Sequence, residues 1–238
     1  MIALFGSKGF VGSEILKSLK NLNYEVYEIT RENFESSLGK EFDYVINAAC
    51  PGARFRAENN PLFDFKECVE KTARIFYEIK FKKFIQISSI AARCQPDTVY
   101  GRNRLAAESI VNDGNSLIVR LGPMYGPTLK KGVLMDMLEG SKVYASKESR
   151  YAFAPLDFNS GWIAKNLDRK GVWEVGAKNS IVLGDLADKL ELNVEFQGVR
   201  DDLEIKTIEK DYPDVDLVMD FMKNQEKYKH KKRGRCLF

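Results

Sequence analysis

The sequence predicts an α/β fold in which helices cover both faces of a doubly wound parallel sheet. Two observations support this prediction: apolar runs rich in Val, Ile and Phe alternate with segments of helical periodicity, and a glycine-rich turn follows the first run. Right-handed crossovers between parallel strands bring ligand sites to the carboxyl ends of the strands. Functional residues are therefore expected where the apolar runs end.

The predicted elements follow in order from the N-terminus. Strands are expected at MIALFG, YEVYEIT, DYVINAAC, KFIQISSI and SLIVRLG, with helices at 10–22, 62–80 and 100–112. After Pro127 the periodicity weakens, and we expect a helix near 130–138, short strands at KVYA, VWEVGA and VEFQGV, and a helix at LGDLADKLE. These later elements could form a small cap.

Composition limits the class of protein. A length of 238 residues and a hydrophobic content of 44% suit one large domain with a sizeable core. Because the first predicted strand begins at Met1, we expect no signal peptide. Because the sequence has no run of 18 apolar residues, we expect no membrane span. Four scattered cysteines without a CxxC pair indicate reduced thiols in a cytoplasmic protein. The single histidine, His230, excludes His-based triads and His metal sites, and we expect no metal.

The net charge of +3 is unevenly distributed. Residues 223–235 hold seven Lys or Arg against one Glu, a balance of +6, so the remainder of the chain sums to −3. We expect this basic segment to be a solvated, frayed tail. Contact with nucleic acid, a membrane surface or a partner protein is a weaker alternative.

The turn GSKGFVG has the spacing of a dinucleotide-binding loop. Gly6 permits a tight turn, Gly9 lets the backbone approach a pyrophosphate, and Gly12 lets the following helix pack close to the sheet. The helix N-terminus offers free N–H groups and a positive dipole end to the phosphates. The strand–turn–helix context predicts a Rossmann-type site, whose contacts also include Ser7, Lys8, Phe10 and Val11.

The end of the second strand favours NADP(H) over NAD. An NAD site usually has Asp or Glu there, but this strand ends in Thr30-Arg31, and Lys8 lies inside the glycine turn. Arg31 and Lys8 could converge on a ribose 2′-phosphate. In the alternative interpretation both cations are solvated, and Glu28 or Glu32 takes the acidic role.

Six segments, in order, resemble the extended short-chain dehydrogenase/reductase superfamily, in its nucleotide-sugar epimerase/dehydratase/reductase branch. They are GSKGFVGS, DYVINAAC, FIQISSIAA, YGRNRLAAE, VRLGPMYGP and the late stretch FAPLDFNSGWIAKNL with GVWEVGAKNSIVLGDLADKL. The second strand and the Lys in the glycine turn are most similar to GDP-fucose synthase and related NADPH-linked 4-keto-sugar reductases. The resemblance covers most of the chain.

The resemblance implies the catalytic residues. Tyr100 matches the general acid/base, and Ser89 matches the residue that hydrogen-bonds the same substrate oxygen; Ser88 is the alternative, since only one of the two can face the site. Arg104 occupies the position of the family's Lys, one helical turn after Tyr100 and on the same face. Arginine supplies positive charge and donors to the ribose, but it cannot join a proton relay. If Tyr100 were only a packed aromatic, none of these roles would follow.

The resemblance also implies further cofactor contacts at the strand ends. With Arg31, Tyr100 and Arg104, these are Asn47, Ala48, Ala49, Cys50, Ile87, Ser88, Leu121, Gly122 and Met124. Arg120 could contact a phosphate or form a structural ion pair. Cys50 and Cys94 could line the pocket, although buried and unreactive thiols are the favoured interpretation.

Two departures from the family pattern predict a reduced substrate pocket. Tyr100 lies only 11 positions after Ser89, and the region after Pro127 is short. The predicted organisation is an NADP-binding domain at 1–126, completed by elements from 150–180, a reduced substrate part at 127–222, and the basic tail at 223–238.

The resemblance implies an NADP(H)-dependent oxidoreductase or epimerase acting on a nucleotide-activated sugar, in polysaccharide biosynthesis. A 4-keto-sugar reductase or an epimerase is favoured over a dehydratase, because Ile90-Ala91 stands where dehydratases commonly have Asp-Glu. The alternative is a non-catalytic NAD(P)-binding redox sensor or assembly protein. Binding of nucleic acid is not expected. The resemblance implies a homodimer, since in this branch the helices that flank the catalytic-Ser strand often form a two-fold interface.

Overall fold

The computed structural model describes residues 1–233, with side chains to residue 225. These residues form two compact units. The first, called the sheet unit, comprises Met1–Leu121 and Leu156–Val175. The second unit comprises Gly122–Pro155 and the chain from Gly176 onward.

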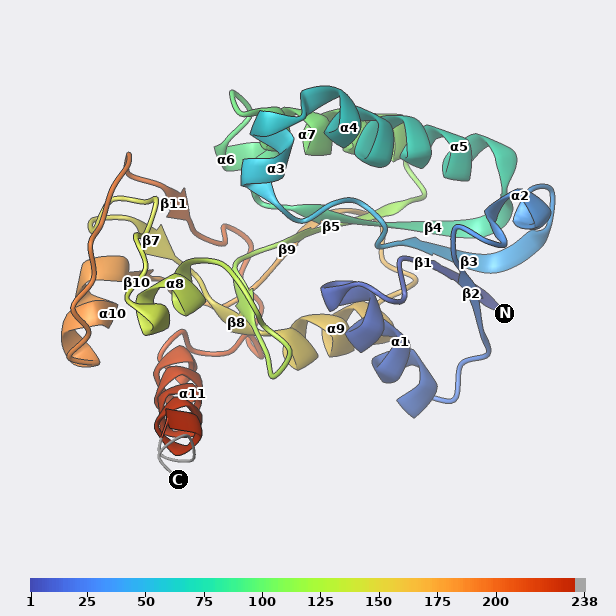
Figure 1. Ribbon diagram of the computed structural model, residues 1–238. Helices are drawn as coiled ribbons and strands as arrows, with labels where there is room; N and C mark the ends of the chain where they lie inside the picture. The colour runs from blue at the N-terminus through green and yellow to red at the C-terminus, as the bar shows by residue number, and fades with distance from the viewer. Residues whose placement is uncertain (234–238) are drawn as a thin grey trace. The chain divides into compact units, whose positions relative to one another are not determined.

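A six-stranded, wholly parallel sheet forms the centre of the sheet unit (Figure 1). Its order is β2-β1-β3-β4-β5-β9. The strands are β1 (Ile2–Phe5), β2 (Val26–Ile29), β3 (Glu41–Asn47), β4 (Lys80–Ser89), β5 (Leu117–Leu121) and β9 (Gly171–Val175). The doubly wound parallel sheet predicted from the sequence is therefore confirmed. The chain reverses its direction of winding between β1 and β3, where such sheets bind ligands.

Helices cover both faces of this sheet, as Figure 1 shows. Helices α1 (Phe10–Asn21) and α9 (Leu156–Lys165) pack together on one face. The other face carries α4 (Pro61–Phe65), α5 (Lys71–Glu78) and α7 (Val99–Val111). Shorter helices are α2 (Phe34–Ser37), α3 (Arg54–Asn59) and α6 (Ala91–Cys94). Because both faces are covered, residues such as Leu4, Ile46, Ile85 and Ile118 are at most 1% exposed.

The helix predicted at 62–80 is interrupted. A π-helical segment, η1 (Lys66–Glu70), separates α4 from α5. The wider π turn lets the adjacent residues Cys68 and Val69 both point into the core, where they are 0% and 7% exposed. Because the apolar spacing remains close to helical on average, the sequence pattern does not reveal the interruption.

Three strands predicted for the cap are placed differently. VWEVGA supplies β9 of the main sheet, where Val119 of β5 lies in register with Trp173. KVYA and VEFQGV form no strand of their own and meet only at an isolated bridge between Val143 and Phe196. KVYA and VEFQGV were therefore wrongly predicted as strands. VWEVGA is a strand, and it lies in the 150–180 stretch that was expected to complete the dinucleotide-binding domain; alternation marked it as strand-forming but did not identify its neighbour.

The second unit contains two small sheets and three helices in its described part. Strand β6 (Met124–Tyr125) pairs with β8 (Ala154–Pro155), and the other sheet has the order β10-β7-β11. Those strands are β7 (Arg150–Tyr151), β10 (Ile181–Val182) and β11 (Asp202–Leu203). The helices are α8 (Val133–Glu139), α10 (Leu183–Lys189) and α11 (Leu217–Arg233).

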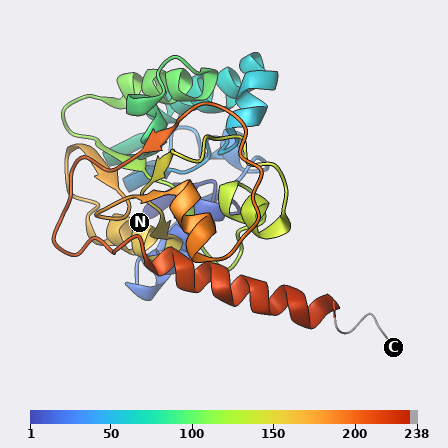
Figure 2. The same cartoon turned by 90° about the vertical axis from the view of Figure 1, so that its left-hand side faces the viewer.

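Helix α11, the long red helix in Figure 2, corrects the prediction of a frayed tail. The basic segment from residue 223 continues this helix as far as Arg233. Val218 and Met222 are buried and anchor its first turns, while Lys, Arg, Gln and Glu are good helix formers. Residues 234–238 lie outside the described part. Among the described residues no helix is both long and apolar enough to cross a membrane.

Candidate active site

The glycine turn lies at the winding reversal between β1 and β3. Gly6 has φ +82°, and a Cβ there would lie 2.5 Å from the Ala48 carbonyl oxygen. A Cβ on Gly12 would lie 2.1 Å from the Gly6 carbonyl oxygen, whereas one on Gly9 would stand 3.2 Å from the same atom. The turn thus packs against its own helix and against the end of β3, which only residues without Cβ allow at positions 6 and 12.

The start of α1 suits a phosphate group. No side chain caps the helix N-terminus, and its first turn holds no acidic residue. The Ser7 hydroxyl is buried and has no hydrogen-bond partner among the described residues. Free N–H groups, a positive dipole end and an unpaired hydroxyl fit the pyrophosphate of a dinucleotide.

A test of this turn compares two glycines of the sheet unit. We expect Gly12→Ala to lower the free energy of unfolding by about 1–3 kcal/mol and to weaken dinucleotide binding, because the new Cβ meets backbone that cannot move aside. Gly161→Ala in α9 is the control, since a Cβ there meets nothing within 4 Å and should leave stability equal or slightly higher. Urea unfolding and fluorescence titration measure both effects. Equal stability and equal dinucleotide binding of the two variants would contradict the assignment of this turn to the dinucleotide site.

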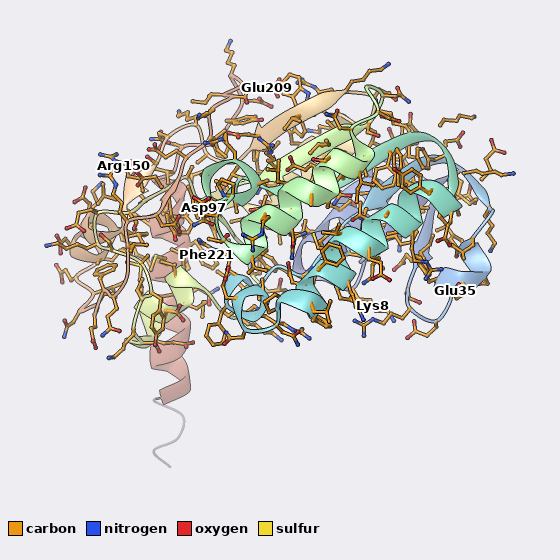
Figure 3. All side chains as sticks on the ribbon, turned by 90° about the horizontal axis from the view of Figure 1, so that it is seen from above. Lys8, Glu35, Asp97, Arg150, Glu209 and Phe221 are labelled. Carbon is orange, nitrogen blue, oxygen red and sulfur yellow. The ribbon has the colours of Figure 1, made fainter. Side chains whose placement is uncertain are left out.

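The end of β2 presents charges of both signs. Arg31 has a side-chain exposure of 85%, and its guanidinium lies 3.7 Å from the Glu67 carboxylate. Lys8 is exposed (Figure 3). A hydrogen bond from Thr30, with the charges of Lys8 and Arg31, holds the pKa of Glu32 below its ordinary value. The Asn33 amide fixes the turn, accepting from the Thr30 N–H at 2.7 Å. Both cations can therefore reach a ligand, and Glu32 stands beside them.

A buried polar network sits at the end of β3. Asn47 donates through Nδ2 to Thr72 Oγ1 and to Gln86 Oε1, each at 3.0 Å, and its Oδ1 accepts from the Ala49 N–H at 3.2 Å. Asn47, Thr72 and Gln86 are at most 1% exposed. Ala48, Ala49 and Cys50 are half-buried. The network fixes the loop that carries these three predicted cofactor contacts.

The two serines at the end of β4 have different surroundings. Ser88 is buried, and its hydroxyl donates to Glu108 Oε1 at 2.5 Å. Ser89 is half-buried, and its oxygen accepts from the Ala91 N–H at 3.2 Å, which leaves its hydroxyl proton to donate elsewhere. The Ser88 side chain is therefore occupied by Glu108, whereas Ser89 keeps a free donor.

Tyr100 and Arg104 form one stacked pair on α7. Thr98 caps the helix by accepting from the Gly101 N–H at 3.0 Å. The Arg104 guanidinium carbon lies 4.7 Å from the centre of the Tyr100 ring, and Arg104 donates through Nη2 to the Pro51 carbonyl oxygen. Both side chains are buried, at 9% and 3% exposure. Burial opposes the charge of Arg104, but the negative forms of Tyr100 and Cys50 outweigh burial and raise the pKa of Arg104.

Arg120 forms a structural ion pair, the second of its two predicted alternatives. Its Nη2 lies 2.6 Å from Glu108 Oε2, and its Nε contacts both carboxylate oxygens at 3.0 and 3.1 Å. The hydrogen bonds that Arg120 donates to the Glu108 carboxylate raise the pKa of Arg120. Glu108 thus joins β4, β5 and α7 through Ser88 and Arg120.

The remaining predicted contacts are spread over both units. Phe10 and Val11 begin α1, while Ile87 and Leu121 are buried in β4 and β5. Gly122 and Met124 belong to the second unit. Sequence reasoning gave no role to Glu108 or Gly101, although both lie in the YGRNRLAAE motif. A Cβ on Gly101 would lie 2.0 Å from the Gln95 carbonyl oxygen, so this glycine lets α7 pack against the loop after α6.

Comparison with known proteins gives a family match. Residues 2–140 match the model of the NAD dependent epimerase/dehydratase family. No curated protein gives a significant match to the sequence.

Solved structures share the fold over almost the whole chain. UDP-N-acetylglucosamine 4-epimerase from Methanobrevibacter ruminantium, in complex with UDP-N-acetylmuramic acid, has a TM-score of 0.76 at 17% identity, covering 97% of this chain and 98% of that chain. UDP-glucuronic acid 4-epimerase from Bacillus cereus, in complex with a fluorinated UDP-sugar and NAD, has a TM-score of 0.68 at 18% identity. The match covers 94% of this chain and 99% of that chain. dTDP-4-dehydrorhamnose reductase from Bacillus anthracis, in complex with NADP, has a TM-score of 0.72 at 13% identity. The match covers 94% of this chain and 97% of that chain.

Proposed function

Because the chain belongs to the NAD-dependent epimerase/dehydratase family, an enzyme family of the short-chain dehydrogenase/reductase type, we propose that it reduces or epimerises a nucleotide-activated sugar with NADP(H). The observation that supports catalysis most directly is the buried stack of Tyr100 and Arg104 on α7. The stack places a permanent positive charge beside the hydroxyl-bearing side chain that would exchange a proton with the substrate.

The proposed site residues divide proton transfer and cofactor binding among them. Tyr100 gives or takes the proton of the sugar hydroxyl, and the free hydroxyl proton of Ser89 polarises the same oxygen. Arg104 supplies positive charge and holds the ribose. The Gly6–Gly12 turn and Ser7 hold the pyrophosphate, and the Asn47–Cys50 segment faces the rest of the nucleotide. A bound nicotinamide supplies or accepts the hydride.

The proposed preference for NADP(H) rests on Lys8 and Arg31. We expect Arg31→Ala to raise the Kd for NADPH by about 10- to 100-fold, because a charge-assisted contact to the 2′-phosphate is lost, and to leave the Kd for NADH nearly unchanged. Lys71→Ala is the matched control, since Lys71 also pairs with Glu67 but lies on α5. Fluorescence titration measures the four constants.

Substitution of Glu32 tests the alternative, a preference for NAD. If the enzyme prefers NAD, the Glu32 carboxylate beside Lys8 would bind the ribose 2′-hydroxyl. Glu32→Ala would then weaken NADH binding, and Arg31→Ala would not change NADPH binding. That pattern would replace NADP(H) by NAD in the proposal.

The substrate class is tested by turnover. We would titrate the protein with both dinucleotides and then add UDP-, GDP- and dTDP-activated 4-keto sugars, following nicotinamide absorbance. Epimerisation without net redox change is followed by chromatography of the same mixtures. Failure to bind either dinucleotide would remove the proposal, and binding without turnover would favour the non-catalytic sensor or assembly protein.

Assembly and location remain predictions. The proposed homodimer is supported by exposed apolar side chains on the α4 and α7 face, where Leu62, Phe65 and Leu105 are 64%, 45% and 38% exposed. Roles in the cytoplasm and in polysaccharide biosynthesis are likewise proposed on the basis of the family resemblance.

A further inference from the structure

The short helix α6 lies in the chain between the two proposed catalytic residues, Ser89 and Tyr100. Ser89 ends β4, and the backbone just after it is held by the Ile90 N–H, which donates to the Leu121 carbonyl oxygen at 3.1 Å. The Ser89 side-chain oxygen accepts from the first amide of α6, that of Ala91. The position of the Ser89 hydroxyl is therefore coupled directly to the position of α6.

Helix α6 also packs against α7 beside Tyr100. Gly101 follows Tyr100 in the chain, and a Cβ on Gly101 would lie 2.0 Å from the Gln95 carbonyl oxygen and 2.6 Å from the Ala91 carbonyl oxygen. The backbone of α6 and of the residue after it therefore rests directly on the first turn of α7. A displacement of α6 would disturb the surroundings of Ser89 and of Tyr100 together.

A bidentate ion pair ties α6 to the sheet. Arg93, in the last turn of α6, donates through Nε to Glu174 Oε1 at 2.5 Å and through Nη2 to Glu174 Oε2 at 3.0 Å. Glu174 lies on β9, two strands away from β4 in the sheet. The two side chains are only 23% and 5% exposed, so the solvent screens this pair weakly. Two parallel hydrogen bonds to one carboxylate fix the orientation of the guanidinium as well as its distance.

The ion pair continues into the charges beneath α7. Glu174 lies in register with Arg120 on the neighbouring strand β5, and Arg120 binds Glu108 of α7. The hydrogen bonds to Glu108 and, against the effect of burial, the charge of Glu174 raise the pKa of Arg120. Alternating charges therefore run from α6 through β9 and β5 to α7, the helix that carries Tyr100. If Arg93 is removed, Glu174 still has Arg120 as a neighbouring cation, so the fold should tolerate the loss.

We propose that Arg93 is a positioning residue: its ion pair with Glu174 holds α6, and through α6 the Ser89 hydroxyl and the start of α7, in the geometry that proton transfer requires. Arg93 acts in this role through the backbone of α6 and not by contact with the reacting atoms. The inference rests on the proposed function, in which Ser89 and Tyr100 act on one substrate oxygen. Misplacing an aligned group by about 1 Å costs about 100-fold in rate, which sets the size of the expected effect.

Steady-state kinetics of Arg93→Met test the positioning role with the sugar found active in the panel. We expect kcat to fall by about 10- to 100-fold, while the KM for the sugar and the Kd for NADPH stay within about threefold, because only the alignment of the catalytic groups changes. Arg93→Lys keeps the positive charge and should recover most of the lost turnover. Arg74→Met is the matched control: Arg74 forms a bidentate pair with Glu35 but lies on α5, so its loss should leave kcat unchanged.

Hydrogen exchange of the full chain, followed by mass spectrometry, gives a readout that does not depend on turnover. In Arg93→Met the amides of residues 90–95 should exchange about tenfold or more faster than in the unchanged protein, because the anchor against local opening of α6 is lost. The amides of β1 and α5 should keep their exchange rates. If Arg93→Met does not fold, Glu174→Gln serves as the second variant, since it keeps the shape of the side chain and removes its charge.

The outcomes separate this inference from the proposed function. Turnover of Arg93→Met equal to that of Arg74→Met, or unchanged exchange of residues 90–95, would overturn the positioning role and leave the proposed function standing. Faster exchange throughout the sheet unit would show that the pair supports the whole fold, and it would overturn the role as well. If the unchanged protein turns over no nucleotide sugar, the proposed function fails, and exchange decides whether the pair holds α6.

Discussion

Tyr100→Phe is expected to lower kcat by about 10²–10⁴-fold while leaving the Kd for the dinucleotide within about threefold, because the variant removes only the proton-transferring hydroxyl. The ring is kept, so the cation–π contact with Arg104, at 4.7 Å, and the packing of the ring against Ala57 and Ala91 should persist. Steady-state kinetics with the best sugar found in the panel measures kcat, and fluorescence titration measures binding.

Arg104→Lys distinguishes an enzyme from a non-catalytic binding protein. Lysine can exchange a proton, which arginine cannot, so an enzyme should show a changed pH profile of kcat and equal or higher turnover. The variant also shortens the side chain and removes the Nη2 contact to the Pro51 carbonyl, so the unfolding midpoint must be measured alongside. If neither Tyr100→Phe nor Arg104→Lys alters any measured activity, the catalytic assignment is wrong and a non-catalytic dinucleotide-binding sensor is favoured.

Glu108→Ala is expected to have the largest effect on stability, about 3–5 kcal/mol of unfolding free energy. The change leaves the Arg120 guanidinium and the Ser88 hydroxyl without their shared carboxylate in a nearly dry interior, since the paired side chains are only 16% and 5% exposed. Urea denaturation followed by circular dichroism measures the loss.

An exposed ion pair of the same unit supplies the control. Arg74 contacts Glu35 at 3.1 Å, but these side chains are 37% and 72% exposed, so Glu35→Ala should cost no more than about 1 kcal/mol. The double variant Glu108→Leu with Arg120→Met should recover part of the loss, because it removes both charges together. If Glu108→Ala were as mild as Glu35→Ala, the buried pair would have no special structural role.

The sequence by itself determined the parts of this protein that depend on local periodicity and spacing. Alternation of apolar strands and amphipathic helices predicted the doubly wound sheet, and the Gly6–Gly12 spacing predicted the turn after β1. The four-residue separation of Tyr100 and Arg104 placed them on one helical face, where the structure brings them together. These features require only neighbours in the chain.

The tertiary structure decided what depends on partners far apart in the sequence. VWEVGA pairs with β5, and the sequence could not specify this pairing because a strand pattern does not identify its neighbour. Ser88 differs from Ser89 because its hydroxyl bonds to Glu108, 20 residues further along the chain. The Cys50 sulfur accepts from the Gln86 amide and contacts the Thr72 hydroxyl, two groups that lie 36 and 22 residues further along the chain. Hydrogen-bond direction and desolvation are set by the folded surroundings, so a side chain's chemistry is fixed only when those surroundings are known.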